Sequence, residues 1–278
     1  MESMHFGFST FFFFGVNISY ALDRLASGGV KVVEFMHEVP HSMEIDGALL
    51  GKIKRLADEG VRFSVHAPFL ETNLGSYFDE VRRFSKERVR AAVEFASVIH
   101  ADPVVVHPGY SLMKEKLRVL NEQASENFLE DLDEMAALAR SLGVRLALEN
   151  GQMPFFFLYN MRDFPGFRDR IPSLGATYDI GHAFIAKYQA READPEGAIL
   201  EDMRQLGLDS LIHVHLHNNR GGRDDHGFLS GTIDMARILR GLHEMGYECK
   251  VILETHEVVE HGLHAVLEKL RSISPVPV

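Results

Sequence analysis

The most informative segment of this chain is Leu211-Ile-His-Val-His-Leu-His-Asn-Asn-Arg-Gly-Gly-Arg-Asp-Asp-His226. In its first half, apolar residues alternate with His213, His215 and His217, and a period of two is typical of a β-strand with two different faces. A glycine pair then permits a turn, and Asp224-Asp225-His226 follows. Imidazole and carboxylate groups are the ligands that Zn²⁺ and related ions prefer. The segment therefore predicts a strand leading into a metal-binding loop, and the alternative for this segment alone is a polar strand end with a solvated loop.

Short apolar runs of this kind recur along the chain and alternate with longer amphipathic segments. The predicted strands are His5–Ser9, Val30–Phe35, Val61–Ala67, Pro103–His107, Val144–Asn150, Leu174–Asp179, Leu211–Leu216 and Lys250–Thr255. The clearest predicted helices are Phe78–His100, Lys114–Leu142 and Ile233–Met245. Strands that alternate with helices predict a parallel sheet. Eight such units in 278 residues predict a closed (β/α)₈ TIM barrel, forming one domain over residues 1–278.

Most of the predicted strands end on an ionisable side chain. These residues are Glu34, His66, His107, Glu149, Asp179, His215 and Glu254. In a TIM barrel the strand ends converge on one face, where the active sites of this fold lie. Many carboxylates in one place repel one another and are costly to bury unless cations neutralise them. Because histidines are interleaved with these carboxylates, the expected cations are metal ions.

Loop residues extend this set. His182 follows Asp179 by one turn, and Asp224 and His226 lie two residues apart in the loop after the seventh strand. The candidate ligands are then nine: His66, His107, Glu149, Asp179, His182, His215, Asp224, His226 and Glu254. One four- or five-coordinate ion cannot use nine side chains. The sequence therefore predicts roughly three divalent ions per chain, and the mixed nitrogen and oxygen ligands favour Zn²⁺ or Mn²⁺.

The ligands stand in motifs that cover about two thirds of the chain in sequence order. The motifs are His66-Ala-Pro68, Thr72-Asn-Leu-Gly75, Val106-His-Pro-Gly109, Leu148-Glu-Asn150, Asp179-Ile-Gly-His-Ala-Phe184, His215-Leu-His-Asn218, Asp224-Asp-His226 and Leu253-Glu-Thr255. Taken together, they resemble AP endonuclease family 2, the xylose isomerase-like TIM barrels, and within it endonuclease IV. The resemblance implies a trinuclear site in which Glu149 bridges two ions. His66 and His107 would complete the first site, Asp179, His215 and Glu254 the second, and His182, Asp224 and His226 would hold the third ion.

The chain also departs from endonuclease IV. After the second strand it carries Glu34-Phe-Met-His-Glu38, which is closer to the acidic strand end of the sugar isomerases and epimerases of the same superfamily, and the loop after His226 is shortened. Two aromatic runs, Phe11–Phe14 and Phe155–Phe157, fall in the predicted loops after strands one and five. They either pack those loops or form an apolar wall that stacks on a sugar or base ring.

Two functions are therefore consistent with the sequence. The first is metal-dependent hydrolysis of a phosphoester, in which clustered ions activate a water and clamp the phosphate oxygens. The second is isomerisation or epimerisation of a sugar or sugar phosphate, with Glu149 and Glu254 as the acid/base pair across one ion. Glu34, Arg220 and Arg223 are the predicted substrate-binding residues. Two arginines suit a small phosphorylated substrate better than a DNA duplex, so DNA is disfavoured as a partner.

Composition limits the remaining possibilities. The formal net charge of −11 argues against a protein that coats nucleic acid, because such binding rests on phosphate neutralisation. No apolar run is long enough to span a membrane, the N-terminal residues do not resemble a signal peptide, and Cys249 is the single cysteine. These features predict a cytoplasmic protein.

The remaining histidines are expected to lie outside the ligand set. His213 or His217 is expected to hold a ligating imidazole, and the histidines predicted to lie on the surface are His41, His243, His261 and His264.

Overall fold

Eight parallel strands form a closed barrel in chain order. The computed structural model describes residues 4–112 and 117–278. The strands are β1 (His5–Ser9), β2 (Val32–Met36), β3 (Arg62–His66), β4 (Val104–Val106), β5 (Leu146–Glu149), β6 (Gly175–Asp179), β7 (Leu211–Leu216) and β8 (Lys250–Leu253). Parallel pairing of β1 with β8, from His5 opposite Lys250 to Phe8 opposite Leu253, closes the barrel. The predicted TIM barrel is confirmed.

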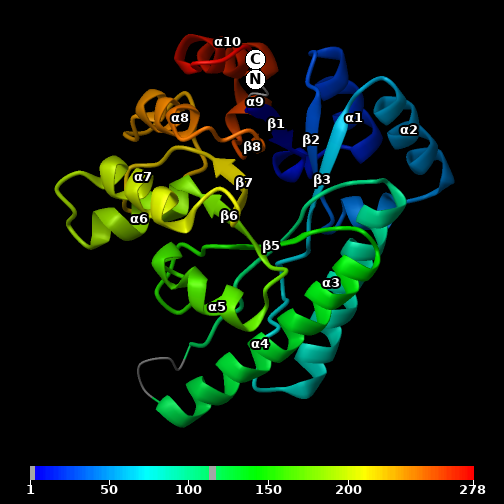
Figure 1. Cartoon of the computed structure of the whole chain (residues 1–278). Coiled ribbons are helices and arrows are strands. Elements are labelled where there is room, and N and C mark those ends of the chain that lie inside the picture. The colour runs from blue at the N-terminus through cyan, green and yellow to red at the C-terminus, as the bar shows by residue number, and fades with distance from the viewer. Residues whose placement is uncertain (1–3, 113–116) are drawn as a thin grey trace.

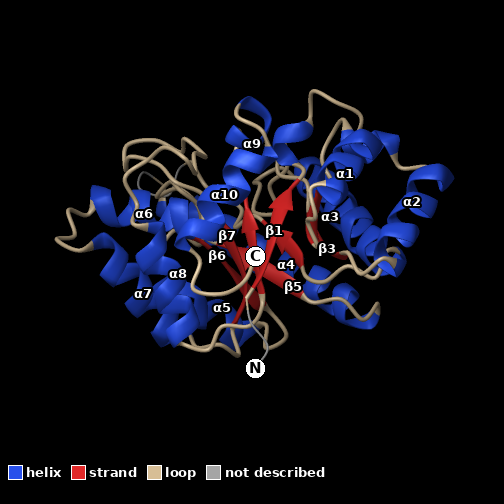
Figure 2. Ribbon diagram, turned by 90° about the horizontal axis from the view of Figure 1, so that it is seen from above, coloured by secondary structure: helices blue, strands red, loops and turns tan. Residues whose placement is uncertain are grey.

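Helices surround this barrel, as Figure 2 shows with the strands in the centre. They are α1 (Ile18–Ser27), α2 (Gly47–Asp58), α3 (Asp79–Val98), α4 (Arg118–Ser141), α5 (Phe164–Arg170), α6 (Ile180–Gln189), α7 (Pro195–Leu206), α8 (Met235–Glu244), α9 (Glu257–Glu260) and α10 (Leu263–Ile273). The long pair α3 and α4 lies side by side in Figure 1, where Arg82 of α3 binds Asp131 of α4 through two hydrogen bonds of 2.9 Å. No helix in the described residues is long and apolar enough to cross a bilayer.

The sequence pattern explains these elements. Strands of a parallel barrel are buried on both faces and need nearly continuous apolar runs, and β4 consists of three buried valines. The predicted helix Lys114–Leu142 begins later than expected, at Arg118, and residues 114–116 of that prediction lie outside the described residues. The second strand was predicted over Val30–Phe35 but is observed over Val32–Met36. The strand runs on to Met36, so Glu34 lies two residues before its end.

Within the described residues, the loops after β1, β2 and β5 contain short 3₁₀ helices, namely η1 (Phe11–Phe13), η2 (His41–Glu44) and η3 (Met161–Asp163). The prediction that His41 lies on the surface is wrong, because η2 folds back over the barrel and buries this residue completely. The His41 ring packs against Phe14 and Phe35, and its Nε2 lies 3.3 Å from the carbonyl oxygen of Phe13. His243, His261 and His264 are exposed, as expected.

Candidate metal centre

Glu149, the last residue of β5, lies at the centre of the strand-end cluster. Its Oε1 is 3.1 Å from Nδ1 of His215 on β7. Its Oε2 is 3.3 Å from Nε2 of His66 on β3 and 3.4 Å from Nε2 of His107. The two oxygens of one buried carboxylate therefore face imidazoles on different sides, which is the arrangement that a bridging ligand requires. His66, His107 and Glu149 can hold one ion between them.

A second group surrounds Nδ1 of His215. This nitrogen lies 3.8 Å from Oδ2 of Asp179 and 3.7 Å from Oε2 of Glu254, in addition to its contact with Glu149. The four side chains come from β5, β6, β7 and the residue directly after β8, because parallel strands in a barrel bring their carboxyl ends to one face. Three carboxylates around one imidazole nitrogen match the oxygen-rich ligand set of a divalent ion.

The third group lies in the loop after β7. Oδ2 of Asp224 is 3.2 Å from Nε2 of His182 and 3.1 Å from Nε2 of His226. His217 joins this group, with its Nε2 3.0 Å from Oδ1 of Asp179 and 3.6 Å from Oδ1 of Asp224. All nine predicted ligands thus gather in one cluster. His217, which the sequence suggested only as a partner of a ligating imidazole, joins the potential ligands, and Gly181 makes room for its ring, because a Cβ at Gly181 would overlap it.

Three of these imidazoles are oriented by backbone carbonyls. Nδ1 of His66 donates to the carbonyl of Ala67 at 2.8 Å, Nδ1 of His182 to that of Asn150 at 2.8 Å, and Nδ1 of His226 to that of Glu254 at 3.1 Å. Because a carbonyl only accepts hydrogen bonds, Nδ1 carries the proton in each ring. Each Nε2 then faces a carboxylate of the cluster and is the ring atom left to bind a metal ion, as in metal sites whose other ring nitrogen is tied to a carbonyl.

Burial and charge act together on these groups. Burial alone would raise the pKa of Glu149, but the neighbouring imidazole of His215, which also hydrogen-bonds to the carboxylate, lowers it well below its usual range. Burial opposes protonation of His215, but the carboxylates of Glu254, Glu34 and Glu149 outweigh it and raise the pKa of His215 well above its ordinary value. His107 differs, since burial lowers its pKa to about 3. Its ring is thus neutral at pH 7 and able to act as a ligand.

The cluster fits divalent ions. Oε1 of Glu254 and Oδ1 of Asp224 are buried and, within the part of the chain that the structure describes, have no hydrogen-bond partner. An unpaired buried carboxylate oxygen is costly, and a bound cation would remove that cost. The number and identity of the ions remain predictions.

Glu34, a predicted substrate-binding residue, lies among histidines of the barrel interior. It is fully buried inside the barrel. Its Oε2 lies 2.7 Å from Nε2 of His213 and accepts a hydrogen bond of 3.0 Å from Ser64, and its Oε1 lies 3.0 Å from Nε2 of His215. Because β2 continues past Glu34, the carboxylate lies one layer below the metal centre. Glu34 therefore contacts His213 and His215, with which it could hold a metal ion, and its role in substrate binding stays a prediction.

The two arginines beside the third group lie at the edge of a polar cleft of about 270 Å³. Arg220 is exposed at this cleft, and Arg223 is 86% exposed and paired with Asp225 at 2.8 Å. Asn219 shapes the turn between β7 and these arginines by accepting a hydrogen bond of 2.8 Å from the Gly221 amide. Binding of substrate by Arg220 and Arg223 stays a prediction.

Of the two aromatic runs, Phe11–Phe14 contributes an apolar wall to the metal centre, and Phe155–Phe157 contributes to the packing of its loop. The Phe12 and Phe11 rings lie 5.2 and 6.0 Å from the ring of His226, so both line the metal centre. Phe69 completes this wall, stacked on His107 at 4.8 Å. In the second run, Phe157 stacks on Phe128 of α4 at 5.3 Å and packs the loop.

Comparison with known proteins agrees with this architecture. The model of the family described as xylose isomerase-like TIM barrel matches residues 22–273. An uncharacterized protein of Methanocaldococcus jannaschii is 28% identical, over 96% of this chain and 92% of its own. A probable endonuclease 4 of Halothermothrix orenii is 26% identical, over 74% of this chain and 77% of its own. A solved structure described as a D-tagatose 3-epimerase-like protein is 26% identical with a TM-score of 0.77, covering 96% of this chain and all of the other.

Proposed function

The chain belongs to the xylose isomerase-like TIM barrel family, and from this premise we propose that it is a divalent-metal-dependent isomerase or epimerase of a small sugar or sugar phosphate. The observation that carries the proposal is the placement of Glu149 and Glu254, which approach Nδ1 of His215 from β5 and from the end of β8 at 3.1 and 3.7 Å. The similarity to the D-tagatose 3-epimerase-like protein, which extends over nearly the whole chain, supports it.

The reaction would use these two carboxylates as a base and an acid. Glu149, Asp179, His215 and Glu254 would hold the ion, which supplies Lewis-acid polarisation of the substrate carbonyl when bound. One glutamate removes the proton from the carbon next to the carbonyl, and the electrons of the broken C–H bond pass into the enediolate. The other glutamate, which starts protonated, delivers its proton to the opposite face of the same carbon for epimerisation. For isomerisation it delivers the proton to the former carbonyl carbon, while the hydroxyl of the first carbon passes its proton to the former carbonyl oxygen, so that the C=O bond moves by one carbon. Phe11, Phe12 and Phe69 would exclude water from this site.

A second function, phosphoester hydrolysis, is favoured by one specific observation. His66, His107, Asp224 and His226 also belong to the cluster, and an isomerase with one ion does not need them as ligands. Two or three ions held by the nine side chains would lower the pKa of a bound water and neutralise phosphate oxygens. The similarity to the probable endonuclease 4 is consistent with this chemistry.

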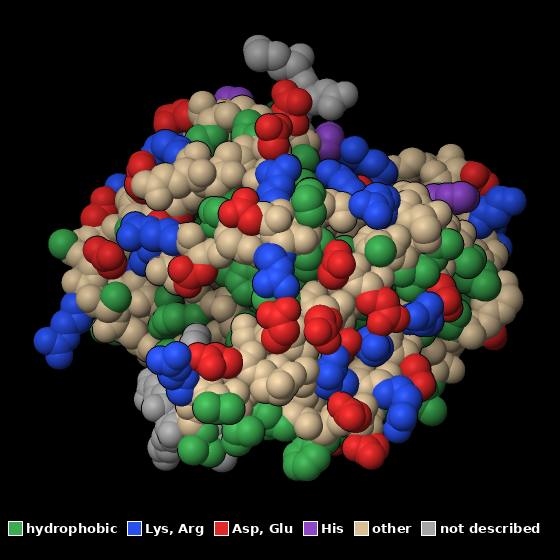
Figure 3. Space-filling view, turned by 60° about the horizontal axis from the view of Figure 1, so that its bottom comes forward, with side chains coloured by type: hydrophobic (Ala, Val, Ile, Leu, Met, Phe, Trp, Pro, Cys, Tyr) green, Lys and Arg blue, Asp and Glu red, His purple; other side chains and the backbone are tan. Residues whose placement is uncertain are grey.

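For either reaction we propose a small substrate. Duplex binding requires many Lys or Arg contacts along a groove. On the face drawn in Figure 3, Lys and Arg side chains are interspersed with Asp and Glu and form no continuous basic stripe. Near the metal centre, the loops after β1 and β2 contribute phenylalanines and glutamates, not arginines.

Proton exchange tests the proposal directly. The protein, loaded with Mn²⁺ or Zn²⁺, is incubated in D₂O with a panel of ketoses and ketose phosphates, and deuterium incorporation next to the carbonyl is followed by NMR. Glu149→Gln and Glu254→Gln should each lower exchange by about 10²- to 10⁴-fold, the usual contribution of a general acid or base. Asp224→Asn, which alters only the third ligand group, serves as the matched carboxylate control and should retain most of the exchange.

The same samples are tested with bis-p-nitrophenyl phosphate. Cleavage of this ester without any C–H exchange, and with Asp224→Asn as damaging as Glu149→Gln, would replace the isomerase by the hydrolase. Wild-type activity and metal content in Glu149→Gln would show that the site itself is wrongly assigned.

A further inference from the structure

A cavity of about 150 Å³ lies beside the metal centre, next to His107. We call it the His107 cavity. His107 connects the two, because its Nε2 lies 3.4 Å from Glu149 while its ring lines the cavity. With its side chain 25% exposed, it is also the most accessible of the nine candidate ligands. A molecule that reaches Glu149 from this side therefore passes the mouth of the cavity.

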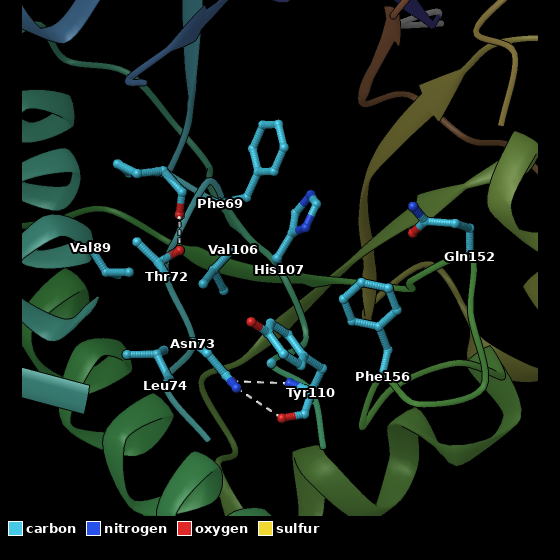
Figure 4. A pocket seen from close by; sticks show the side chains of 12 residues that line it. Phe69, Thr72, Asn73, Leu74, Val89, Val106, His107, Tyr110, Gln152 and Phe156 are labelled. Carbon is cyan, nitrogen blue, oxygen red and sulfur yellow. Dashed lines mark hydrogen bonds between the residues drawn. The ribbon is translucent and has the colours of Figure 1, made fainter. Parts of the chain in front are cut away.

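The walls of the His107 cavity are mainly apolar. They include Leu74, Val89 and Val106 together with the rings of Phe69, Tyr110 and Phe156, and Figure 4 shows these side chains around the central space. Apolar cavities of about this size, roughly 150 Å³, stay dry and take up a benzene-sized molecule. The volume and lining therefore fit a six-membered ring or a branched alkyl group.

Two polar side chains of the wall, Thr72 and Asn73, are already engaged. Thr72 donates to the carbonyl of Pro68 at 3.0 Å. The Asn73 side chain donates to the carbonyl of Tyr110 at 2.9 Å and accepts from the amides of Gly75 and Tyr110 at 3.0 and 3.1 Å. A stable water needs two to four polar partners. These side chains consequently leave little to hold a cluster of waters.

Gln152 offers the cavity a hydrogen-bond acceptor. Its Oε1 is buried and has no hydrogen-bond partner among the described residues, and in Figure 4 the side chain extends from its loop toward His107. A buried acceptor without a donor costs free energy that a ligand with an N–H or O–H group would recover. The cavity thus presents mainly apolar walls and a buried acceptor at Gln152.

The loops that form the cavity are joined to each other. The amide of Ser111 donates to the carbonyl of Phe155 at 3.0 Å, and the amide of Phe157 donates to that of Gly109 at 3.1 Å. Gly151 permits this packing, because a Cβ there would overlap the ring of Phe156. The wall facing His107 is therefore held by backbone hydrogen bonds, and the site is formed before a ligand arrives.

We propose that the His107 cavity binds a ring-sized, mainly apolar group of the substrate that carries one hydrogen-bond donor directed at Gln152. The substrate class is then a sugar with an apolar or aromatic substituent, attached away from the reacting carbons. This assignment to the substrate rests on the proposed function, whereas the binding of an apolar ring to the cavity does not.

Binding of 4-fluorophenol and fluorobenzene to the metal-loaded protein, followed by ¹⁹F NMR, tests the cavity without any turnover. Both probes should show saturable binding at one site. Val89→Phe fills the space and should abolish binding of both, and Tyr110→Ala removes a ring from the wall and should weaken both by about tenfold. Tyr159→Ala is the matched control, because Tyr159 is also a half-buried tyrosine of a rim loop but lines a separate cavity. It should bind like the wild type.

Gln152→Leu separates the acceptor from the apolar walls. This substitution should weaken the binding of 4-fluorophenol by about fivefold, the cost of one neutral hydrogen bond. The affinity for fluorobenzene should not change. Absence of saturable binding to the wild type, or equal binding by the wild type and Tyr110→Ala, would overturn the proposal. If the probes bind as expected and no sugar undergoes C–H exchange, the cavity assignment survives and the proposed isomerase function fails.

Discussion

Replacement of Glu34 by glutamine tests whether a carboxylate beneath the metal centre orients His215. Nδ1 of His215 faces Glu149, Asp179 and Glu254, so its proton belongs on Nε2, which lies 3.0 Å from Glu34. A carboxylate next to the outer nitrogen of a ligating imidazole fixes the tautomer and the ring orientation and raises the basicity of the ligand. Burial would raise the pKa of Glu34, but His215 and His213 lower it well below its usual range. Glu34 is therefore ionised at neutral pH.

The expected magnitude follows from these contacts. Glutamine has nearly the same shape but replaces one carboxylate oxygen by an NH₂ group, which must then oppose an N–H of His213 or His215. Loss of one charged hydrogen bond costs about 1.5–3 kcal/mol. Substitution of such a partner of a metal ligand usually weakens metal binding by about 10- to 100-fold. We expect a loss in this range at the tightest site of Glu34→Gln.

Zn²⁺ titration in competition with a chelating dye measures this loss. The absorption spectrum of the Co²⁺-loaded protein provides a second readout, because it changes when an imidazole ligand is lost or reoriented. Glu38→Gln is the matched control. Glu38 is a buried glutamate just after the same strand that accepts hydrogen bonds from the amides of Phe69 and Leu70 at 3.0 and 2.9 Å. It should lose stability and keep its metal affinity.

The reasoning would be refuted by a Glu34→Gln protein whose Zn²⁺ affinity lies within twofold of the wild type and whose Co²⁺ spectrum is unchanged. Equal losses in Glu34→Gln and Glu38→Gln would also count against it, because they would show a general weakening of the barrel rim.

Three further outcomes are expected. Elemental analysis of metal-replete protein should give more than one divalent ion per chain, and an ion-to-chain ratio that never exceeds one would leave only the single-ion isomerase. Chelation should lower the melting temperature by several degrees, because ions at about 1,000 times their Kd stabilise the fold by about 4 kcal/mol per site. Burial and then the charge of Arg88 lower the pKa of His37 to about 4. Because an unfolded histidine titrates near 6.5, its contribution to stability is complete above about pH 6.5 and is lost as the pH falls toward 4; urea unfolding at pH 7 and pH 5 should show a smaller loss for His37→Leu than for the wild type, and parallel losses would contradict the assignment. Finally, a duplex with an abasic site should bind weakly and be cut slowly at most, and rapid metal-dependent incision with nanomolar affinity at moderate salt would identify a DNA-repair enzyme.

The barrel and its ligand cluster followed from the sequence because both depend on the chain's periodicity. Parallel strands joined by helices bring their carboxyl ends to one face, so a residue such as Glu149 or Asp179 at a strand end has its position fixed by topology alone. The predicted strand ends differ from the observed ones by one or two residues in most strands. For most strands that error had no consequence, but in β2 it changed the layer of the barrel in which a charged residue lies.

A period of two predicts which side chains point into a barrel, but it does not predict how far along the barrel axis each of them lies. His213 and His215 of β7 and His217 directly after it lie on one side of the chain, and the pattern cannot tell which of them meets the ions. Each step of two residues moves a side chain by about 6.6 Å along the strand, so His213 reaches Glu34 below the cluster while His217 reaches Asp179 and Asp224. This choice depends on the stagger of neighbouring strands, which is set by the closure of the whole barrel.

The position of Glu34 also changes how the two reactions are weighed. In the sequence it was an argument for a sugar isomerase, because an acidic group at the end of strand two was expected to face the substrate. In the structure its carboxylate lies beside His215, a ligand that both reactions would use, and Glu38 accepts hydrogen bonds from backbone amides. The acidic residues after β2 therefore no longer separate the two reactions. What separates them is whether His66, His107, Asp224 and His226 hold ions during turnover. The proton transfer between Glu149 and Glu254 requires one ion, whereas water activation by clustered ions requires the whole set.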